Sequence, residues 1–557
     1  MEKILIIQLS RMGDLIQTLP LLQRLKQDRP EREITLVCLR EFQGVVEDQP
    51  LFDRLVALEL ADVHKLGDEA NRQKFWQLTP FKDIPELSEP YDLVVNLTHD
   101  EGSAMLCEKI HSRRKSGRTH TFPNEIRLLG DWAKYLFAAA NNRRQNLFNL
   151  VDIYLGMGGV AHRPASHYLE VDRDAEMDAL DLLREQGCAG KGKLVALQMG
   201  ASDLRRAWPV EKFAALAQRM AVEPDLEIVL LGNRREAALG SEFLRLANGP
   251  AINLIGKTEV HQLPALLKSC DLLISNDTGT IHIAAAVGTR VVGLYFSTAY
   301  FAETAPYGEG HVILQAESEN LTTRPSEAST DSHSADFLPV DAVVAVVRKL
   351  LGRGDGSVPS YPQLVLYQSK FLANGTLIYA PIGKAAGYGA GLLSRSMWEK
   401  ALGISTDAAF VRELLPALCA AQDLGRHLAD HRQAVLRMQS KFSEGFALAH
   451  KLAAAADLGA QTDDASSVLH DQFSRTVEGI SSFGEGLGLL ADFFHFEIMD
   501  LDFLPKPALA AELGRKFQKL ENLSQICLET LESIERLGNR AERGRDQNDV
   551  ALWRAQQ

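Results

Sequence analysis

Residues 271–296, with the sequence DLLISNDTGTIHIAAAVGTRVVGLYF, constrain the fold of this chain more than any other stretch. Two apolar runs, 272–274 and 291–296, have the composition of buried strands. Between them, a polar turn at 275–279 leads into an apolar segment at 281–287. Strand, turn, helix and strand in this order predict a βαβ unit, in which the two strands are parallel. The chain is therefore expected to be an α/β protein.

The turn inside this unit is a candidate ligand site. Gly279 permits a close approach of the backbone, and Thr280 and His282 lie where a helix would begin. Unpaired amides and the positive end of the helix dipole would favour an anionic ligand there. An ordinary capped junction, with Asp277 or Thr278 as the N-cap, accounts for the same residues. On this stretch alone, both interpretations stay open.

A second strand-to-helix turn lies at the start of the chain. The apolar residues 3–8 predict a strand, and leucines at helical spacing from Leu15 onward predict the helix after it. The turn contains Gly13 and Asp14, and open α/β sheets bind their ligands at such strand ends. Asp14 is therefore a candidate catalytic carboxylate. The alternative is an acidic first-turn residue that interacts with the helix dipole.

A third turn follows a strand predicted at residues 193–198. It contains Ser202, Arg205 and Arg206 next to a glycine, so one hydroxyl and two cations lie where a diphosphate could bind. A further strand at 227–231 leads to Glu236, and a carboxylate in that position commonly binds ribose hydroxyls.

Strands and helical segments alternate along the first two thirds of the chain. Besides those above, strands are predicted at residues 34–39, 92–96 and 253–255. This alternation predicts parallel sheets with helices on both faces.

Length and composition limit the class of protein. A chain of 557 residues is too long for one hydrophobic core, so two or three domains are expected. A net charge of −13 argues against a general nucleic-acid binder. The six cysteines form no CxxC pair, and the first residues resemble a strand rather than a signal peptide. A cytoplasmic protein with reduced cysteines is expected.

Together these motifs resemble the family 9 glycosyltransferases, the ADP-heptose:lipopolysaccharide heptosyltransferases. The resemblance covers roughly residues 1–351 and depends on the order of four segments: 12–20, 200–209, 232–236 and 276–282. It implies a GT-B fold of two Rossmann-like domains that face each other across a cleft. Residues 1–185 would form the acceptor domain, and residues 186–351 would bind the nucleotide sugar.

The resemblance also implies roles for individual residues. Asp14 matches the general base that deprotonates the acceptor hydroxyl. The donor-binding positions are Gly13, Ser202, Arg206, Glu236, Thr258, Asp277, Thr278, Gly279, Thr280 and His282. Of these, Ser202 and Arg206 would hold the diphosphate, Glu236 the ribose and Thr258 the base.

Such enzymes invert the anomeric centre without a metal, and no cofactor is expected besides the nucleotide sugar. The residues agree, because the sequence holds no convincing Asp-x-Asp metal motif and Arg206 offers a fixed cation. Two positions depart from the family pattern. Arg206 replaces a frequent lysine, and the turn at 232–236 reads GNRRE rather than the commoner Gly-Gly-Pro type. ADP-heptose is the expected donor.

The segment from 105 to 145 is basic in an otherwise acidic chain. Its Arg113, Arg114, Lys115 and Arg118, together with Arg11, are candidate acceptor-binding residues. Such a patch could receive an anionic acceptor or contact the inner face of the bacterial inner membrane. A solvated helical face is the alternative interpretation.

The remainder of the chain lies outside the resemblance. A flexible loop is expected at 317–336, a closing helix at 337–351, a linker at 352–362 and a hairpin around Asn374-Gly375. The glycine-rich segment 383–391 lacks the lysine of a phosphate loop. Seams of apolar residues at 424–442 and 513–534 predict packed helices, and His427 and His431 are not expected to bind metal. Residues 363–557 would form a mainly helical accessory domain.

The expected function is inverting, metal-independent transfer of a sugar from a nucleotide sugar. The acceptor would be a lipopolysaccharide, another glycolipid or a protein, and the accessory helices would serve homo-oligomerisation or partner docking. The alternative function is a non-catalytic sugar-nucleotide-binding or scaffold protein that works through its helical domain.

Overall fold

The computed structural model describes most of the first 382 residues. The gaps are 68–83, 122–124, 144–145, 191, 224, 298, 317–333, 355–358, 360 and 362, and beyond 382 isolated residues between 395 and 532 are described. Contacts group the chain into two units. The first comprises Met1–Ile126, Phe148–Phe371 and Gly375–Lys384, and the second comprises Arg127–Leu147, Leu372–Asn374 and Ala385–Gln557.

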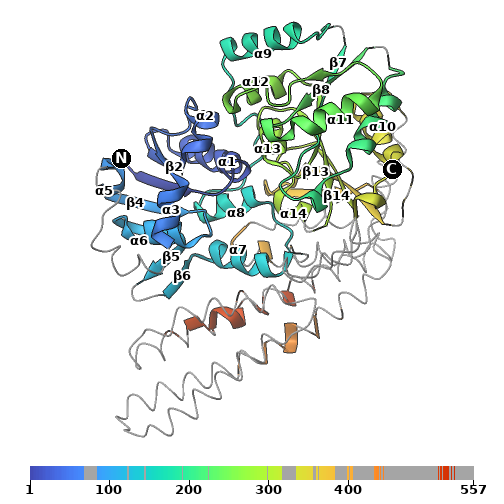
Figure 1. Ribbon diagram of the computed structural model, residues 1–557. Helices are drawn as coiled ribbons and strands as arrows, with labels where there is room; N and C mark the ends of the chain where they lie inside the picture. Colours follow the sequence, from blue (N-terminus) through green and yellow to red (C-terminus); the bar gives the residue numbers. More distant parts are fainter. Residues whose placement is uncertain are drawn as a thin grey trace, which may run out of the picture. The chain divides into compact units, whose positions relative to one another are not determined.

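The first sheet has six strands in the order β3-β2-β1-β4-β5-β6 (Figure 1). These are β1 (Lys3–Gln8), β2 (Glu33–Leu39), β3 (Arg54–Leu58), β4 (Tyr91–Asn96), β5 (Ser112–Thr121) and β6 (Glu125–Leu129). Strands β1 to β5 are parallel, and Ile4 of β1 pairs with Ile34 on one side and Leu93 on the other. Strands β1 and β2 are apolar along almost their whole length, as strands covered on both faces must be.

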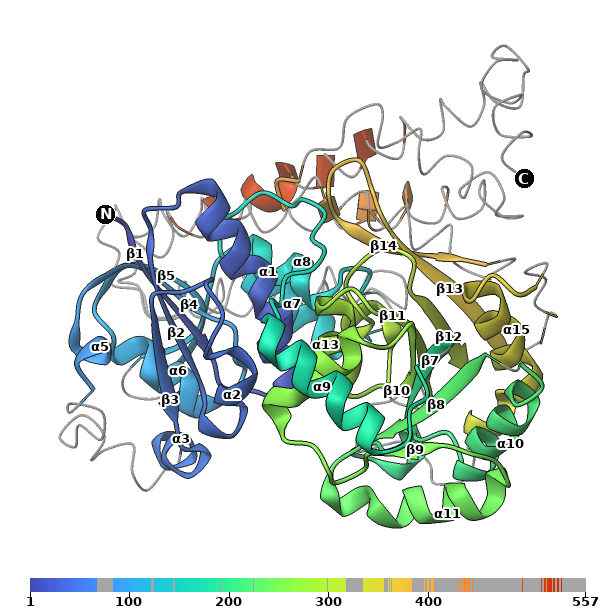
Figure 2. The same cartoon turned by 90° about the horizontal axis from the view of Figure 1, so that it is seen from above.

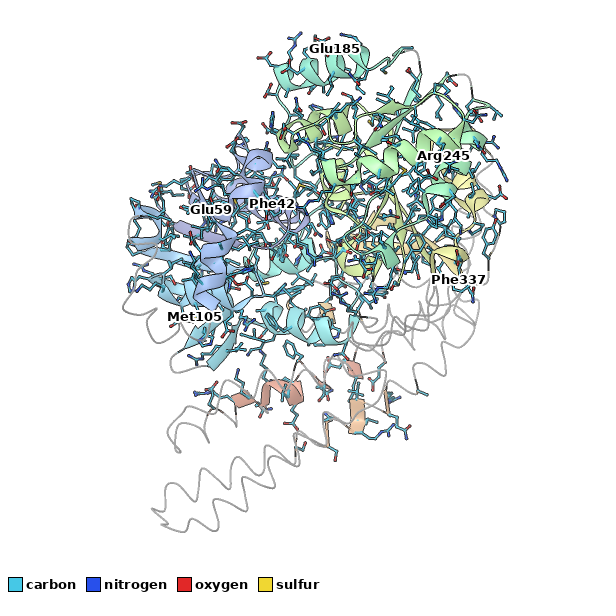
Figure 3. All side chains as sticks on the ribbon, in the orientation of Figure 1. Phe42, Glu59, Met105, Glu185, Arg245 and Phe337 are labelled. Atoms are coloured by element: carbon cyan, nitrogen blue, oxygen red, sulfur yellow. The ribbon has the colours of Figure 1, made fainter. Side chains whose placement is uncertain are left out.

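Helices cover both faces of this sheet. They are α1 (Met12–Asp28), α2 (Gln43–Val46), α3 (Leu60–Gly67), α5 (Pro85–Ser88), α6 (Glu101–Lys109) and α8 (Leu150–Met157), with a 3-10 turn η1 (Arg40–Phe42). Alternate strand residues such as Leu5 and Ile7 pack on Val63 of α3 and Met105 of α6. Phe42 lies against the same core (Figure 3). Helix α1 packs on α8.

The second sheet has eight strands in the order β14-β13-β12-β11-β10-β7-β8-β9. These are β7 (Lys193–Gln198), β8 (Leu226–Leu231), β9 (Ile252–Asn253), β10 (Leu272–Asn276), β11 (Arg290–Tyr295), β12 (Val312–Ala316), β13 (Leu364–Phe371) and β14 (Leu377–Pro381). Strands β7 to β12 are parallel, whereas β13 and β14 are antiparallel to their neighbours.

Three long helices cover one face of the second sheet. They are α10 (Val210–Met220), α11 (Ala237–Ala247) and α15 (Val340–Leu350) (Figure 2). Their side chains Phe213, Phe243 and Val343 are buried in the core between these helices and the sheet. Phe337, labelled in Figure 3, packs at the edge of this core. The remaining elements are α9 (Arg173–Glu185), α12 (Leu263–Lys268), α13 (Gly279–Ala286), α14 (Phe301–Thr304), η3 (Leu204–Arg206), η4 (Arg234–Glu236), η5 (Val260–Gln262) and η7 (Ser334–Phe337).

Both sheets share the strand order of a Rossmann-like fold. In the first, the order reverses between β1 and β4, and in the second it reverses between β7 and β10. Ligands of open α/β sheets bind at the carboxyl ends of the strands at such reversal points. The loops after these four strands are therefore the place to look for a site.

The division into domains differs from the expectation at three places. Helix α9, which was assigned to the first domain, packs on α12 of the second, and Lys268 pairs there with Glu176. The hairpin around Gly375 has the expected strands, but β13 pairs with β12. Residues 363–382 thus extend the second sheet rather than begin an accessory domain. Residues 127–147, also assigned to the first domain, group with the second unit.

The second unit includes helix α7 (Asp131–Asn141) and isolated residues of the C-terminal region. Tyr135 of α7 makes an edge-to-face contact with Trp398, whose ring also meets Phe493, at centroid distances of 4.9 and 5.1 Å. Arg395 and Glu399 form a buried ion pair, with 2.9 Å between Nε and Oε1.

Most predictions for the C-terminal region lie outside the described residues. These are the loop 317–336 up to residue 333, the glycine-rich segment 383–391, His427, His431 and most of the two apolar seams. Val435 and Leu520, one residue from each seam, are described and buried.

Candidate active site

Asp14 lies in the first turn of α1, directly after β1. Its carboxylate accepts a hydrogen bond from the amide of Arg11, with 3.2 Å between N and Oδ2. Burial raises the pKa of Asp14 to about 6. Arg11 opposes this shift, whereas the negative charge of Glu303 adds to it. A carboxylate with a pKa near neutrality can accept a proton from a hydroxyl group more readily than an ordinary one.

The Asp14 turn is anchored to the carboxyl end of the first sheet. Gln8, the last residue of β1, donates from Nε2 to the Thr18 hydroxyl at 3.3 Å and to the Asp14 carbonyl at 3.4 Å. The Thr18 hydroxyl also donates to the Asp14 carbonyl, at 2.9 Å. These bonds hold the first turn of α1 over the end of β1, where the strand order reverses.

The N-terminus of α13 meets the N-terminus of α1. A Cβ atom on Gly13 would lie 2.8 Å from His282 Cδ2, and one on Gly279 would lie 2.8 Å from Met12 Cε. Met12 Cε is the end of a flexible side chain and can move, whereas the His282 ring is buried in α13, so Gly13 is the position at which a side chain would disturb the contact. The first turns of two helices, one from each sheet, therefore converge on one place, and both favour anionic groups.

Arg206 and Asp277 form an ion pair beside this junction. The guanidinium comes from η3 in the loop after β7, and the carboxylate follows β10. The two side chains are 18% and 7% exposed, and the Thr304 hydroxyl donates to the other Asp277 oxygen at 3.3 Å. The pair thus fixes a cation at the rim of the helix junction.

Asn276 ties the same two loops together. Its amide nitrogen donates to the Met199 carbonyl at 2.7 Å, and its Oδ1 accepts from the amide of Trp208 at 2.9 Å. The loop that carries Ser202 and Arg206 is therefore fastened to the end of β10. Asn276 belongs to the segment 276–282 that carries the family resemblance, but the sequence did not show that its side chain holds the loop after β7 in place.

Glu236 lies over the ends of β7 and β8. Its Oε2 accepts from the amide of Asn233 at 2.8 Å and from Gln198 Nε2 at 3.2 Å. A Cβ atom on Gly200 would lie 1.7 Å from Glu236 Oε1, so any larger residue at position 200 would displace the Glu236 carboxylate. The carboxylate is thereby placed at the reversal point of the second sheet.

The other predicted donor residues lie around this region. Ser202 is exposed in the loop between β7 and η3, and Thr258 is half-buried after β9. Thr278 precedes α13, and its hydroxyl lies 3.2 Å from that of Ser275. Thr280 and His282 are buried in the first turns of α13.

His282 is a neutral imidazole. Burial lowers its pKa to about 3. Among the described residues, its Nδ1 finds no hydrogen-bond partner. It packs on Gly13, so the ring contributes to the close contact of the two helices rather than supplying a positive charge.

The basic residues do not form a single patch. Arg113, Arg114, Lys115 and Arg118 lie on strand β5, not on a helical face as the alternative interpretation had it. Successive residues of a strand point to opposite faces. The side-chain nitrogen-to-oxygen distance is 3.4 Å from Arg113 to Asp92, 3.9 Å from Arg114 to Glu2 and 3.3 Å from Lys115 to Glu108. These three cations thus each have an acidic neighbour.

Two of the predicted acceptor residues lie near the ends of strands. The Arg118 guanidinium donates to the carbonyl of His99, after β4. Arg11 is exposed immediately before α1. These two, rather than Arg113 and Arg114, lie at the carboxyl edge of the first sheet.

Glu303 and Tyr154 were not anticipated from the sequence. Glu303 lies in α14, a single turn without a periodic signal, and its charge acts on both Asp14 and Tyr154. Tyr154 of α8 accepts a hydrogen bond from Gln8 at 3.4 Å. Burial raises the pKa of Tyr154 well above its ordinary value.

Neither a metal cluster nor a membrane span is found in the part of the chain that the structure describes. No group of three or more His, Cys, Asp or Glu side chains there is arranged to hold a metal ion. No helix among those residues is long and apolar enough to cross a membrane.

Residues 84–332 match the family model described as glycosyltransferase family 9 (heptosyltransferase). The chain is 26% identical over 310 residues to lipopolysaccharide heptosyltransferase 1 of Campylobacter coli, which covers 53% of this chain and 84% of that protein. It is 24% identical over 339 residues to the lipopolysaccharide core heptosyltransferase OpsX of Haemophilus influenzae, which covers 59% and 89%. The solved structure of E. coli ADP-heptose lps heptosyltransferase II covers 63% of this chain and 99% of its own, with 17% identity and a TM-score of 0.45.

Proposed function

Because the chain is a glycosyltransferase of family 9, we propose that it transfers a heptosyl residue from ADP-heptose to a lipopolysaccharide acceptor. The observation that carries this proposal is the junction at Gly13 and Gly279. A carboxylate, a cation and two helix N-termini surround it, and they come from both sheets.

The donor binds at the carboxyl edge of the second sheet. Glu236 accepts hydrogen bonds from the ribose hydroxyls, and Thr258 lies beside the base. The diphosphate binds to Arg206, the Ser202 hydroxyl and the amides at the start of α13, because these groups are cationic or donate hydrogen bonds. Arg206 is already paired with Asp277, which holds its guanidinium in place before the donor arrives.

Asp14 acts as the general base. The acceptor oxygen attacks the anomeric carbon as the bond from that carbon to the phosphate oxygen breaks. The hydroxyl proton passes to Asp14, and ADP leaves with the bonding electrons. Attack from the face opposite the leaving group inverts the anomeric centre.

Fixed groups of the protein stabilise the leaving diphosphate without a metal ion. Negative charge develops on the phosphate oxygen as the bond breaks, and preorganised cations and amides lower the energy of that state. Arg206 and the first turns of α1 and α13 supply them. We therefore expect transfer to continue in the presence of a chelator.

The acceptor is a lipopolysaccharide core rather than a protein. Both curated relatives described above are lipopolysaccharide heptosyltransferases, and their alignments extend over most of their own length. Arg11 and Arg118 lie at the carboxyl edge of the first sheet and would contact an anionic core saccharide there.

Calorimetric titration in EDTA tests the donor half of the proposal. Wild type is titrated with ADP, UDP, GDP and ADP-heptose, and we expect binding of ADP and ADP-heptose. Arg206→Ala should weaken ADP binding about 10- to 100-fold, because a charge-assisted hydrogen bond contributes roughly 1.5–3 kcal/mol.

The chain offers a matched control one residue away. Arg205 is 46% exposed and pairs with Asp203 at 2.7 Å, so Arg205→Ala should bind ADP as wild type does. The double variant with Arg206→Ala and Asp277→Asn distinguishes two causes of weaker ADP binding. If Arg206 contacts the phosphates, the double variant binds ADP as weakly as Arg206→Ala. If the unpaired Asp277 carboxylate repels ADP, the double variant recovers binding. Preference for UDP or GDP would contradict the ADP-heptose assignment, and binding of no nucleotide would favour a scaffold.

A further inference from the structure

The two oxygens of the Asp277 carboxylate have different partners. Oδ2 pairs with the Arg206 guanidinium, and Oδ1 accepts a hydrogen bond from the Thr304 hydroxyl, with 3.3 Å between the two oxygens. Arg206 has a long side chain, and holding such a side chain in one conformation costs conformational entropy. A carboxylate that is fixed at both oxygens cannot turn away from the guanidinium. Thr304 therefore completes a chain of contacts that ends at the cation proposed to bind the diphosphate.

Thr304 is fastened to the end of strand β11. It is the last residue of the single turn α14, which follows β11 along the chain (Figure 1). Tyr295, the buried last residue of β11, donates from its hydroxyl to the Thr304 carbonyl at 3.1 Å. Strand β11 pairs with β10, which leads directly into Asp277. Thr304 and Asp277 are thus held by neighbouring strands of the same sheet.

The residue that follows α14 is held by two further side chains. The Ala305 carbonyl accepts hydrogen bonds from the Tyr379 hydroxyl at 3.0 Å and from Asn149 Nδ2 at 2.8 Å. Both donors are buried, and they come from strand β14 and from the N-cap of α8. At the start of α14, the Phe301 ring stacks on Tyr367 of β13, with centroids 4.1 Å apart. Helix α14 is therefore held at both ends, and its last residue has little freedom to move.

We propose that Thr304 positions the Arg206 guanidinium for the donor diphosphate, acting through Asp277. This inference rests on the proposed function, in which Arg206 binds the diphosphate. The Thr304 hydroxyl holds one oxygen of the carboxylate, and the other oxygen then keeps the guanidinium in a fixed place before the donor binds. Preorganisation of this kind raises affinity, because less freedom is lost on binding. Thr304 takes no part in proton transfer or bond cleavage, so it is a positioning residue.

Nucleotide binding by Thr304→Val tests this role, because valine lacks the hydroxyl group. Wild type and variant are titrated calorimetrically with ADP, UDP and GDP in EDTA, since all three carry the same diphosphate. Thr304→Val should bind the preferred nucleotide about 3- to 10-fold more weakly, which corresponds to the net contribution of a typical hydrogen bond. Thr304→Ser keeps the hydroxyl and should recover most of the affinity. Equal affinity of wild type and Thr304→Val, or equal losses in the valine and serine variants, would overturn the inference.

Thr289→Val is the matched control for a merely structural effect. The Thr289 hydroxyl is buried and donates to the Leu267 carbonyl at 2.6 Å. Thr289 lies directly before β11, so the control removes the same kind of bond at the opposite end of that strand. It should lower the denaturant concentration at which the protein unfolds without changing nucleotide affinity. If the control loses as much nucleotide affinity as Thr304→Val, loss of stability accounts for the effect and the inference fails.

A double-mutant cycle with Asp277→Ala shows whether Thr304 acts through Asp277. Without the carboxylate, the Thr304 hydroxyl no longer acts on the guanidinium, so Thr304→Val should weaken binding no further in the Asp277→Ala background. A further loss of the same size would contradict the proposed route.

The proposed function fails by different results. Preference for UDP or GDP contradicts the ADP-heptose assignment, and a wild type that binds ADP-heptose but transfers no sugar contradicts the transferase. Either result leaves the comparison of Thr304→Val with wild type valid. A wild type that binds none of the three nucleotides would overturn the inference about Thr304 as well.

Discussion

At the scale of single residues, the proposed role of Asp14 as the general base depends on its burial. A carboxylate in water would be a weak base, but burial raises the pKa of Asp14 to about 6. The same burial makes the ionised side chain unfavourable for folding. An active site that needs such a group therefore sacrifices stability, and that loss can be measured without any substrate.

Asp14→Asn should stabilise the protein at alkaline pH. The pKa of Asp14 is 3.8 in the unfolded chain and about 6 in the folded one, so the folded state disfavours the ionised form. The disadvantage is absent below about pH 4, grows between pH 4 and 6, and is complete above pH 6. Partial exposure limits it to about 1–2 kcal/mol.

Denaturant unfolding at pH 4 and pH 8 measures this difference. The Asn side chain keeps an oxygen that can accept the hydrogen bond from the Arg11 amide, so any difference in stability reflects the charge rather than loss of that bond. Wild type and Asp14→Asn should match at pH 4 and differ at pH 8. A variant that is less stable than wild type at pH 8 would contradict the assigned pKa.

At the scale of elements, the site depends on the contact between α1 and α13. Gly13→Ala places a methyl group 2.8 Å from His282 Cδ2, and overpacking of this kind costs typically about 1–3 kcal/mol. It should also push the two helix N-termini apart and weaken ADP binding. Thermal unfolding and calorimetry measure the two effects.

Gly44→Ala is the matched control for this substitution. Gly44 lies in α2, and its nearest neighbours would be 3.8 Å from an added Cβ, an ordinary van der Waals distance. The control should be neutral or slightly more stable, because alanine favours helices. If Gly13→Ala has the same thermal stability and ADP affinity as Gly44→Ala, the close contact between α1 and α13 contributes to neither property.

The β13–β14 hairpin is fastened to the first domain by Asp152 of α8. This buried carboxylate accepts from the Tyr307 hydroxyl at 3.2 Å and from the Leu377 amide at 3.1 Å. Asp152→Ala leaves both donors without this acceptor and should cost about 2–4 kcal/mol. Asp152→Asn should recover part of the loss, because its oxygen can accept from the amide while its nitrogen donates to the hydroxyl.

Chemical unfolding of both variants tests this attachment. The exposed Asp178 on α9 provides a neutral control in Asp178→Ala. If Asp152→Ala unfolds at the same denaturant concentration as this control, the hairpin attachment contributes nothing to stability.

The sequence predicted the elements whose patterns are strong. Strand β1 and the βαβ unit around α13 have long apolar runs that end in polar turns, and Asn374-Gly375 indicated a hairpin. Strand β5 was missed because Arg113 to Arg118 interrupt any apolar alternation. Helix α14 was missed because a single turn has no period.

Long-range pairing was also beyond the sequence. Arg206 and Asp277 were both candidates, but 71 positions separate them and no local pattern joins them. The partner of β13 likewise could not be read from its turn, which determines only the pairing with β14. For the same reason Glu303 was not recognised, because its relevance arises from Asp14 in the other sheet.

At the scale of the whole molecule, the first unit joins two Rossmann-like sheets at their reversal points. The expectation of two such sheets is confirmed, while the helical C-terminal domain lies largely outside the described residues. Apart from Gly13 in α1, the residues proposed for donor binding lie in the loops and helix starts of the second sheet, and the proposed base lies in the first turn of α1 after the first sheet's β1. The central claim is that sugar transfer occurs where these two sets meet.

The direct test is transfer from ADP-heptose to heptose-free lipopolysaccharide in EDTA, followed by ADP release and by NMR of the product. We predict ADP release that requires the acceptor, a product with inverted anomeric configuration, and loss of at least about a thousandfold in rate for Asp14→Asn, whose ADP binding is unchanged. Acceptor-dependent transfer by Asp14→Asn at the wild-type rate, or no transfer by a wild type that binds both substrates, would contradict the account.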